Sequence, residues 1–381
     1  MSRTILGIER VSEFKNIFEN KRIGLITNPT GIDGNFKSSI DILREQTNLV
    51  GLFSPEHGVR ASIQAGQHLE TYIDDETGIT VYSLYGKTRR PTKEMMDAVD
   101  VMTIDIQDVG SRYYTFIYTM AYCMQACKEY GKKFVVFDRP NPVNCEKVEG
   151  NILDLKYRSF VGYYPMPQRH GLTIGELALL FNKEYKIGCD LEVIPMLNYE
   201  RSMSFEDTSL PWVIPSPNFP TINTAYAYNI TCVLEGTNVA EGRGTTTPFE
   251  LFGAPWMKSE VLSRQLNELN LPGVYFRPQY FTPTFSKYAG ELCGGVYLHI
   301  TDRNACHSIK TSWAILKVIR ENYPEHFKIN APYVEGRPCM FEFETGCDYI
   351  RDMTYTLEEE WALLDKDEAE FKNIRKEYLI Y

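Results

Sequence analysis

Short runs of apolar, β-branched residues alternate with longer amphipathic stretches through the first two hundred residues of this chain. A run of about four to eight apolar residues between turns is typical of a buried strand, whereas apolar residues spaced three or four apart are typical of a helix. The predicted strands are Arg22–Thr27, Asn48–Phe53, Thr80–Leu84, Val99–Asp105, Lys133–Asp138 and Leu191–Pro195. The predicted helices are Phe36–Gln46, Thr92–Val99, Ser111–Tyr130 and Thr173–Tyr185. This alternation predicts an α/β fold with a mostly parallel, doubly wound sheet and helices on both faces.

The second part of the chain has a different pattern, which predicts a smaller α+β lobe. It contains an apolar run at Asn229–Leu234, a Gly-rich segment expected to lead into a helix, and a strand at Gly295–Thr301. Further helices are expected near Ser259–Leu269, at Ser308–Tyr323 and from Leu357 onward. The proline-rich stretch WVIPSPNFPTIN, Trp212–Asn223, is typical of a connection between lobes or of a loop at the edge of a cleft. We therefore predict two domains, residues 1–228 and 229–381.

Charge and apolar content exclude several classes of partner. The chain has 40 Lys and Arg against 50 Asp and Glu, a net charge of −10, and no basic block. Nucleic-acid binding normally needs a basic face that displaces counterions, so no nucleic-acid partner is expected. No run approaches roughly 18 apolar residues, so no membrane partner is expected either. The amino terminus lacks an export signal, which predicts a cytoplasmic protein, or an exported one whose leader was removed.

The cysteine pattern and the absence of cofactor motifs exclude further kinds of site. Nine cysteines, an odd and scattered set, predict free buried thiols instead of a disulfide framework. The segment after the first strand, Asn28–Gly34, lacks the GxGxxG spacing of a dinucleotide site, and no GxxxxGK[ST], GxSxG or HExxH motif occurs. We therefore expect neither a cofactor nor a bound metal, and the chemistry that remains is that of carboxylates.

Polar clusters follow three predicted strands, at the edge where an open parallel sheet binds its ligand. Glu56 and His57 follow the second strand, and Asp105 and Asp108 stand at the end of the fourth. Glycoside hydrolysis typically uses two carboxyl groups that flank the bond. Glu56 is the preferred acid, because Pro55 fixes its backbone. Asp105 and Asp108 are candidates for the second carboxylate. For Asp105 a structural role, in which it ties the strand end to a neighbouring loop, is slightly preferred over a catalytic one. His57 is more simply a hydrogen-bonding partner than a base.

Two later segments contain candidate recognition residues. Arg169 and His170 precede Thr173 and Glu176, which have the spacing of a helix capping box. The segment Glu235–Pro248 is rich in glycine and hydroxyl groups and contains Arg243 between two glycines. Such a loop is either an exposed turn or a binding loop, and we favour binding because an arginine there can approach a carboxylate closely.

The motifs ITNPTG, FSPEHGVR, DIQDVGSRYYT, FDRPNP, RHGLTIGELA, PSPN and EGTNVAEGRGTTTPFELFGAPW lie between Ile26 and Trp256. With these motifs the chain resembles the exo-β-N-acetylmuramidases, peptidoglycan-recycling glycosidases long catalogued as a domain of unknown function. The resemblance implies a Rossmann-like domain without nucleotide, a smaller carboxy-terminal domain and an active site in the cleft between them. It also implies release of β-1,4-linked N-acetylmuramic acid from the non-reducing end of peptidoglycan fragments, with Glu56 as the main catalytic carboxyl.

Recognition of this sugar would need a cation, because N-acetylmuramic acid differs from N-acetylglucosamine by a lactyl carboxylate. The arginine candidates, in order of preference, are Arg243, Arg112 and Arg169. The complete set of candidate catalytic residues is Glu56, Asp108, His57 and Glu241. The candidate substrate-binding residues are Arg243, Arg112, Arg169, His170, Tyr114, Asn141, Asn218 and Asn238. A non-catalytic sugar-binding protein is the main alternative, and a nucleotide-dependent enzyme is disfavoured by the missing glycine pattern.

Overall fold

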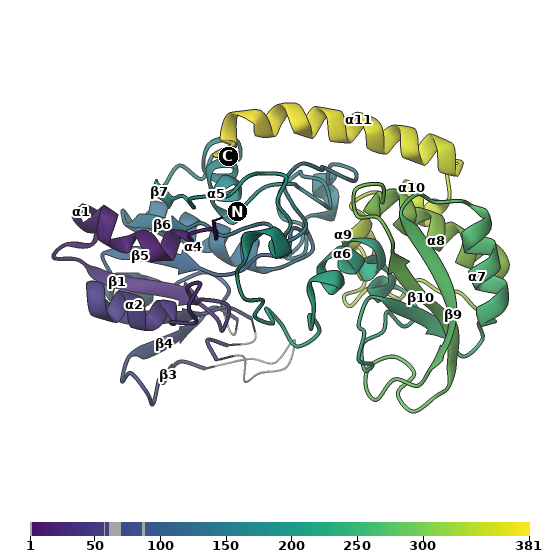
Figure 1. The fold of residues 1–381 in the computed structure, drawn as a ribbon, viewed down its shortest axis with the longest axis horizontal. Coiled ribbons are helices and arrows are strands. Elements are labelled where there is room, and N and C mark those ends of the chain that lie inside the picture. Colours follow the sequence, from purple (N-terminus) through teal and green to yellow (C-terminus); the bar gives the residue numbers. More distant parts are fainter. Residues whose placement is uncertain (1, 57, 61–69, 86–87) are drawn as a thin grey trace.

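A seven-stranded sheet forms the centre of the first lobe, with the strand order β3-β4-β2-β1-β5-β6-β7 (Figure 1). The fold is a computed structural model that describes residues 2–56, 58–60, 70–85 and 88–381. The strands are β1 (Arg22–Thr27), β2 (Asn48–Ser54), β3 (Tyr72–Ile73), β4 (Thr80–Ser83), β5 (Val101–Asp105), β6 (Lys133–Phe137) and β7 (Asp190–Ile194). Neighbouring strands are parallel, except that β3 is antiparallel to β4. The predicted mostly parallel sheet is confirmed.

Both faces of this sheet are covered, because successive side chains of each strand point to opposite sides. On β6, Phe134 and Val136 pack in one core cluster, whereas Val135 and Phe137 pack in another. The first cluster includes α4 and α5, and the second includes α2 and the 3-10 helix Gly7–Phe14. The helices of this lobe are α1 (Lys15–Phe18), α2 (Ser39–Gln46), α3 (Lys93–Asp97), α4 (Phe116–Tyr130) and α5 (Ile174–Lys183). Helices on both faces make the sheet doubly wound, as predicted.

The second lobe has a three-stranded antiparallel sheet in the order β8-β10-β9. Its strands are β8 (Leu251–Ala254), β9 (Val274–Phe281) and β10 (Cys293–Ile300). The helices from this lobe onward are α6 (Ile222–Thr231), α7 (Ser259–Glu268), α8 (Ser308–Asn322), α9 (Met340–Thr345), α10 (Tyr349–Asp352) and α11 (Leu357–Arg375). The apolar run Asn229–Leu234 ends α6 and enters a 3-10 helix, Cys232–Gly236.

Two details of the sequence interpretation are corrected. A strand, β8, follows the Gly-rich segment where a helix was expected, because it pairs with β10 some forty residues later. Glycines allow this close pairing, since a Cβ at Gly253 would lie 2.2 Å from the carbonyl oxygen of Gly294. In the first lobe, α4 begins at Phe116 and not at Ser111. The residues before Phe116 form a loop, in which Gly110 has a positive φ of 77°.

Helix α11 runs across both lobes (Figure 1). In the second lobe Asp365 of α11 pairs with Lys310 of α8, at 2.5 Å. In the first lobe Arg375 donates to the carbonyl of Cys145, at 2.9 Å, and the hydroxyl of Tyr381 donates to Asp138, at 2.8 Å. The division at residue 228 stays a prediction; that residue lies within α6, and the end of the chain returns to the first lobe.

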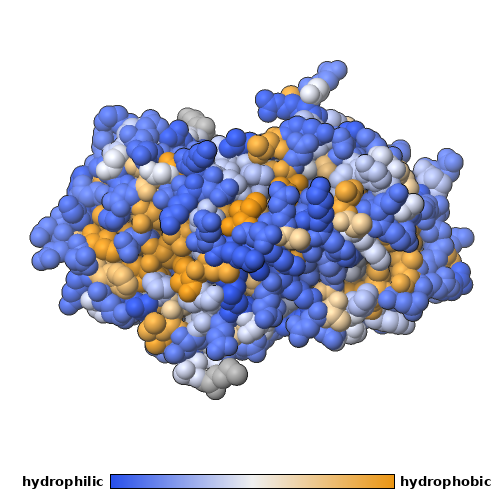
Figure 2. Space-filling model, turned by 90° about the horizontal axis from the view of Figure 1, so that it is seen from above, coloured by the Kyte–Doolittle hydropathy of each residue, from blue (hydrophilic) through white to orange (hydrophobic). Residues whose placement is uncertain are grey.

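The surface seen from above is largely hydrophilic and is interrupted by separate apolar patches (Figure 2). None of the helices in the described ranges has the length and apolar character needed to cross a membrane. All nine cysteines are free and buried, as predicted.

Candidate active site

A cavity of about 970 Å³ lies where the two lobes meet. From the first lobe, Glu56 and Tyr85 come from just after β2 and β4, and residues 113–116 come from the loop after β5 and the start of α4, so the cavity lies beyond the carboxyl ends of these parallel strands. The proline-rich connection and the second lobe complete it. The lining residues are Glu56, Tyr85, Tyr113, Tyr114, Thr115, Phe116, Val161, Ser216, Asn218, Phe219, Tyr228, Glu235, Arg243, Phe285, Tyr333 and Met340.

Glu56 stands in the turn after β2 and is held there by hydroxyl groups. The hydroxyl of Thr115, the residue that precedes α4, donates to Oε2 of Glu56 at 2.9 Å. On the other side, burial, the charge of Glu56 and a hydrogen bond to its carboxylate raise the pKa of Tyr85 to about 12. Tyr85 therefore keeps its proton near neutral pH. The carboxyl of Glu56 is thus held in the cavity wall by Thr115 at the start of α4, and Tyr85, just after β4, lines the cavity with it.

An aromatic surface forms another part of the lining. The ring of Tyr114 lies edge-on to Phe219 at 5.2 Å and to Tyr228 at 6.1 Å between ring centroids. Burial raises the pKa of Tyr114 well above its usual value, which keeps its hydroxyl as a donor. Packed rings with polar edges offer an apolar face and a hydrogen-bonding hydroxyl together, the combination that a sugar ring needs.

The wall from the second lobe contains Arg243 among carboxyl groups. Its Nη1 lies 2.7 Å from Glu235 and 3.4 Å from Glu241, and Lys287 lies 3.0 Å from Glu241. Although burial opposes the charge of Arg243, these two carboxylates raise its pKa. Burial and the neighbouring charge of Glu235 raise the pKa of Glu344 well above its usual value. Arg243 therefore remains charged and is held in place by the two carboxylates.

Comparison with known proteins identifies the family. A family model described as "Exo-beta-N-acetylmuramidase NamZ, N-terminal" matches residues 23–223, and its C-terminal counterpart matches residues 226–381. The chain belongs to the exo-β-N-acetylmuramidase NamZ family. It is 50% identical over 374 residues to the peptidoglycan β-N-acetylmuramidase NamZ of Bacillus subtilis (strain 168), which covers 97% of this chain and 89% of that protein. The predicted family, and with it the predicted class of enzyme, a glycosidase, are confirmed.

Two solved structures share this fold. Both are DUF1343 family proteins from Bacteroides fragilis NCTC 9343, and each alignment covers 100% of this chain and 99% of the other. One is 38% identical with a TM-score of 0.91, and the other is 36% identical with a TM-score of 0.79. The two-lobed NamZ architecture is therefore shared over the whole chain.

Asp108 and His170, both predicted site residues, form a buried pair outside the cavity lining. Oδ2 of Asp108 accepts a hydrogen bond from the amide of Gly110 at 2.8 Å and lies 3.4 Å from Nε2 of His170. Nδ1 of His170 accepts from the amide of Leu172 at 3.2 Å. Oδ1 of Asp108 has no hydrogen-bond partner among the described residues. The pair connects the loop after β5 to the segment before α5.

Four other predicted binding residues make contacts that hold the backbone. Arg112 is fully buried and donates to the carbonyls of Asn151, Met166 and Glu344, at 3.2, 2.9 and 2.6 Å. Arg169 is also buried; it donates to the carbonyl of Val143 and lies 3.2 Å from the carboxylate of Glu149.

The two asparagines act in the same way. The amide of Asn141 donates to the carbonyl of Leu172 at 3.0 Å, and that of Asn238 donates to the carbonyl of His326 at 2.8 Å. Within the described ranges none of these four residues lines the cavity.

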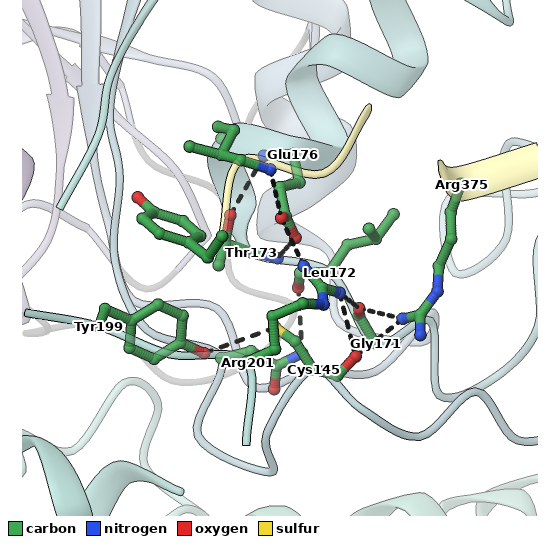
Figure 3. A network of polar contacts seen from close by, with 12 residues as sticks. Cys145, Gly171, Leu172, Thr173, Glu176, Tyr199, Arg201 and Arg375 are labelled. Carbon is green, nitrogen blue, oxygen red and sulfur yellow. Dashed lines mark hydrogen bonds and ion pairs between the residues drawn. The ribbon is translucent and has the colours of Figure 1, made fainter. Parts of the chain in front are cut away.

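A polar network around the start of α5 explains the RHGLT motif (Figure 3). Thr173 and Glu176 form the predicted capping box, which is confirmed. Arg201 pairs with Glu176 at 2.5 Å and donates to the carbonyl of Gly171 at 2.7 Å. Arg375, from the end of α11, donates to the same carbonyl (Figure 3). This network holds the motif in place and links it to the end of the chain.

One cluster has the composition of a metal site. His307, Asp365 and Glu368 offer ligand atoms within 4.8 Å of one another. Asp365 is already paired with Lys310, and Glu368 accepts from the amide of Gly150 at 2.9 Å. These contacts connect α8, α11 and the first lobe, so a structural role at this junction explains why the three side chains lie together.

The cavity thus brings together Glu56, Tyr114, Asn218 and Arg243 from the predicted set. Glu241 stands behind Arg243, and His57 lies outside the described residues. The sequence interpretation did not select Tyr85 or Glu235. Glu235 and Glu241 are each followed by glycine in the same motif, so the sequence carries no signal that separates the one in the wall from the one behind it.

Proposed function

We propose that this chain hydrolyses the β-1,4 bond of a non-reducing terminal N-acetylmuramic acid in peptidoglycan fragments, in the cavity between its two lobes. Membership of the NamZ family supports the reaction. The observation that carries the choice of site is the placement of Glu56, at a strand end, in the wall of a cavity of sugar size and beside an aromatic surface.

Glu56 acts on the glycosidic bond in this proposal, and Glu235 is its partner. Glycosidases with a carboxyl pair place the two groups on either side of the scissile bond. Glu56 comes from the first lobe and Glu235 from the second, and both line the cavity. Asp108 and Glu241 are positioning residues, because the first contacts His170 and the second contacts Arg243 and Lys287.

Arg243 selects N-acetylmuramic acid through its lactyl carboxylate. Among the described residues its ion pairs run through Nη1, so Nε and Nη2 are available to a ligand in the cavity. A guanidinium with two adjacent N–H groups binds a carboxylate in bidentate fashion. The anchoring carboxylates fix its direction, which lowers the entropy that binding would cost.

The test is product analysis with a defined N-acetylmuramyl-β-1,4-N-acetylglucosamine disaccharide. Glu56→Gln is expected to lower kcat by roughly 10²–10⁴-fold, because the amide can neither donate nor accept the catalytic proton. Mass spectrometry measures the released monosaccharide, and circular dichroism checks that the variant is folded. Glu260→Gln is the matched control, since Glu260 is an exposed carboxylate on α7 that contacts Tyr280.

Near-normal turnover by folded Glu56→Gln would contradict the assignment of Glu56. Tight binding of the disaccharide by the unmodified protein without product would instead favour the alternative, a sugar-binding protein without catalysis.

A further inference from the structure

Two arginines beside the cavity carry charges that no carboxylate compensates. Arg89 and Arg158 are exposed and form no ion pair within the described ranges, and the remaining residues of the chain include no Asp or Glu. Their neighbours behave differently, since Arg90 pairs with Glu129, and Lys156 pairs with Asp348 at 2.7 Å. In a chain with a net charge of −10, two unpaired guanidinium groups over one aromatic cluster form a local positive region.

Both arginines lie over aromatic rings that form a continuous strip. Arg89 lies 3.9 Å above the ring of Phe160, and Arg158 lies 3.6 Å above that of Tyr163. Tyr122 joins the two rings: it stacks parallel to Phe160 at 6.0 Å and lies edge-on to Tyr163 at 5.1 Å. We call these residues, with Tyr85, the arginine–aromatic strip.

The strip is continuous with the proposed active site. The ring of Tyr85 lies 6.2 Å from that of Phe160, and Tyr85 lines the cavity together with Glu56. Val161, the residue after Phe160, also lines the cavity. A ligand chain that leaves the cavity on this side therefore passes directly onto the strip.

We propose that the strip binds the part of the glycan that follows the scissile bond, an inference that rests on the proposed function. An enzyme that acts on a terminal sugar holds that sugar in the cavity, and the rest of the strand extends out of it. Sugar rings pack on aromatic faces, and in this glycan every second sugar carries a lactyl carboxylate, which the arginines bind. Arg89 and Arg158 thus set a preference for longer strands.

Kinetics on two substrate lengths test this proposal. The unmodified protein is expected to have a higher kcat/KM for the tetrasaccharide, two disaccharide repeats, than for the disaccharide. In the double variant Arg89→Gln/Arg158→Gln, kcat/KM for the tetrasaccharide is expected to fall by about tenfold, mostly through KM, since the one lactyl carboxylate beyond the scissile bond then has no arginine partner on the strip. The disaccharide has no second lactyl group, so the fold loss in its kcat/KM should be about five times smaller than the loss for the tetrasaccharide. The assays use low ionic strength, because salt screens exposed charges.

Arg277→Gln is the matched control. Arg277 is an exposed arginine of β9 that lies over the ring of Tyr297 at 5.7 Å, on the second lobe and outside the cavity lining. It should leave the ratio of the two kcat/KM values unchanged.

Two results would overturn the inference. The first is that the unmodified protein has the same kcat/KM for both substrates. The second is that the double variant loses kcat/KM equally on both substrates, which would mean that the arginines only support Tyr85 and Glu56. Failure of the proposed function gives a different result: the unmodified protein would release no N-acetylmuramic acid from either substrate. The role of the strip in that reaction would then be rejected together with the reaction itself.

Discussion

Arg169 and Arg243 have opposite surroundings, although both were candidates for the same carboxylate. Arg169 is buried beside Glu149, whereas Arg243 lines the cavity. Burial would raise the pKa of Glu149, but the charges of Arg169, His307 and Lys147 outweigh it and lower that pKa to about 2. Arg169 therefore stabilises a buried charge, and Arg243 faces the ligand.

Arg169→Met is expected to lower the free energy of unfolding by about 3–5 kcal/mol, because it leaves Glu149 charged and buried without its main partner. Urea denaturation measures the loss. The double variant Arg169→Met/Glu149→Gln should recover part of it, since the buried charge is then absent. A wild-type unfolding midpoint combined with a raised KM would contradict this and would make Arg169 a substrate ligand.

Local sequence determined some residues of the site but not the direction of their side chains. Glu56 follows a predicted strand, and its place in the cavity agrees with that position. Asp108 and Asn141 also follow strands, yet they turn toward His170 and the carbonyl of Leu172. The strand end places a residue at the correct edge of the sheet, while packing against later segments decides which way it points.

At the scale of elements, the start of α5 joins a local cap to a distant strand. The hydroxyl of Thr173 accepts from the amide of Glu176 at 3.2 Å and donates to Asp138, just after β6, at 2.8 Å. The first bond could be predicted from residues three apart. The second could not, because thirty-five residues separate its partners.

Thr173→Ala is expected to destabilise the protein by about 1–2 kcal/mol, the usual cost of losing a helix N-cap. The loss should fall at the upper end, because the bond to Asp138 is removed as well. Thermal unfolding measures it. Thr173→Ser keeps the hydroxyl and should remain near wild type; a similar loss in both variants would show that the methyl group, and not the cap, matters.

At the scale of the whole molecule, α11 and the last residues join the two lobes, and a buried carboxyl, that of Asp138, lies where the last residue contacts the first lobe. Asp138 accepts from the amide of Gly175 at 2.7 Å and from the hydroxyl of Tyr381 at 2.8 Å. Burial nevertheless raises the pKa of Asp138 to about 7, from an ordinary value of 3.8. The fold therefore holds this proton more tightly than the unfolded chain does.

This difference predicts a dependence of stability on pH. Between pH 3.8 and about 7 Asp138 is protonated in the folded protein and loses this proton when the chain unfolds. The contribution of the bound proton to stability is therefore complete below pH 3.8 and is lost as the pH rises through about 7. Asp138→Asn should remove that decline. Melting temperatures of both proteins from pH 4 to 8 provide the comparison, and parallel curves would contradict the raised pKa.

The sequence by itself determined the parallel strands of the large sheet, though not the short antiparallel β3, together with the family and the capping box of α5. Each of these is encoded by residues that are close in the chain, where periodicity, turns and spacing act directly. Only the tertiary structure decided that β8 pairs with β10, that Arg169 meets Glu149 while Arg243 lines the cavity, and that an arginine–aromatic strip extends from Tyr85. Those outcomes depend on which distant segments pack together, and the burial and charge around a side chain exist only after they have done so.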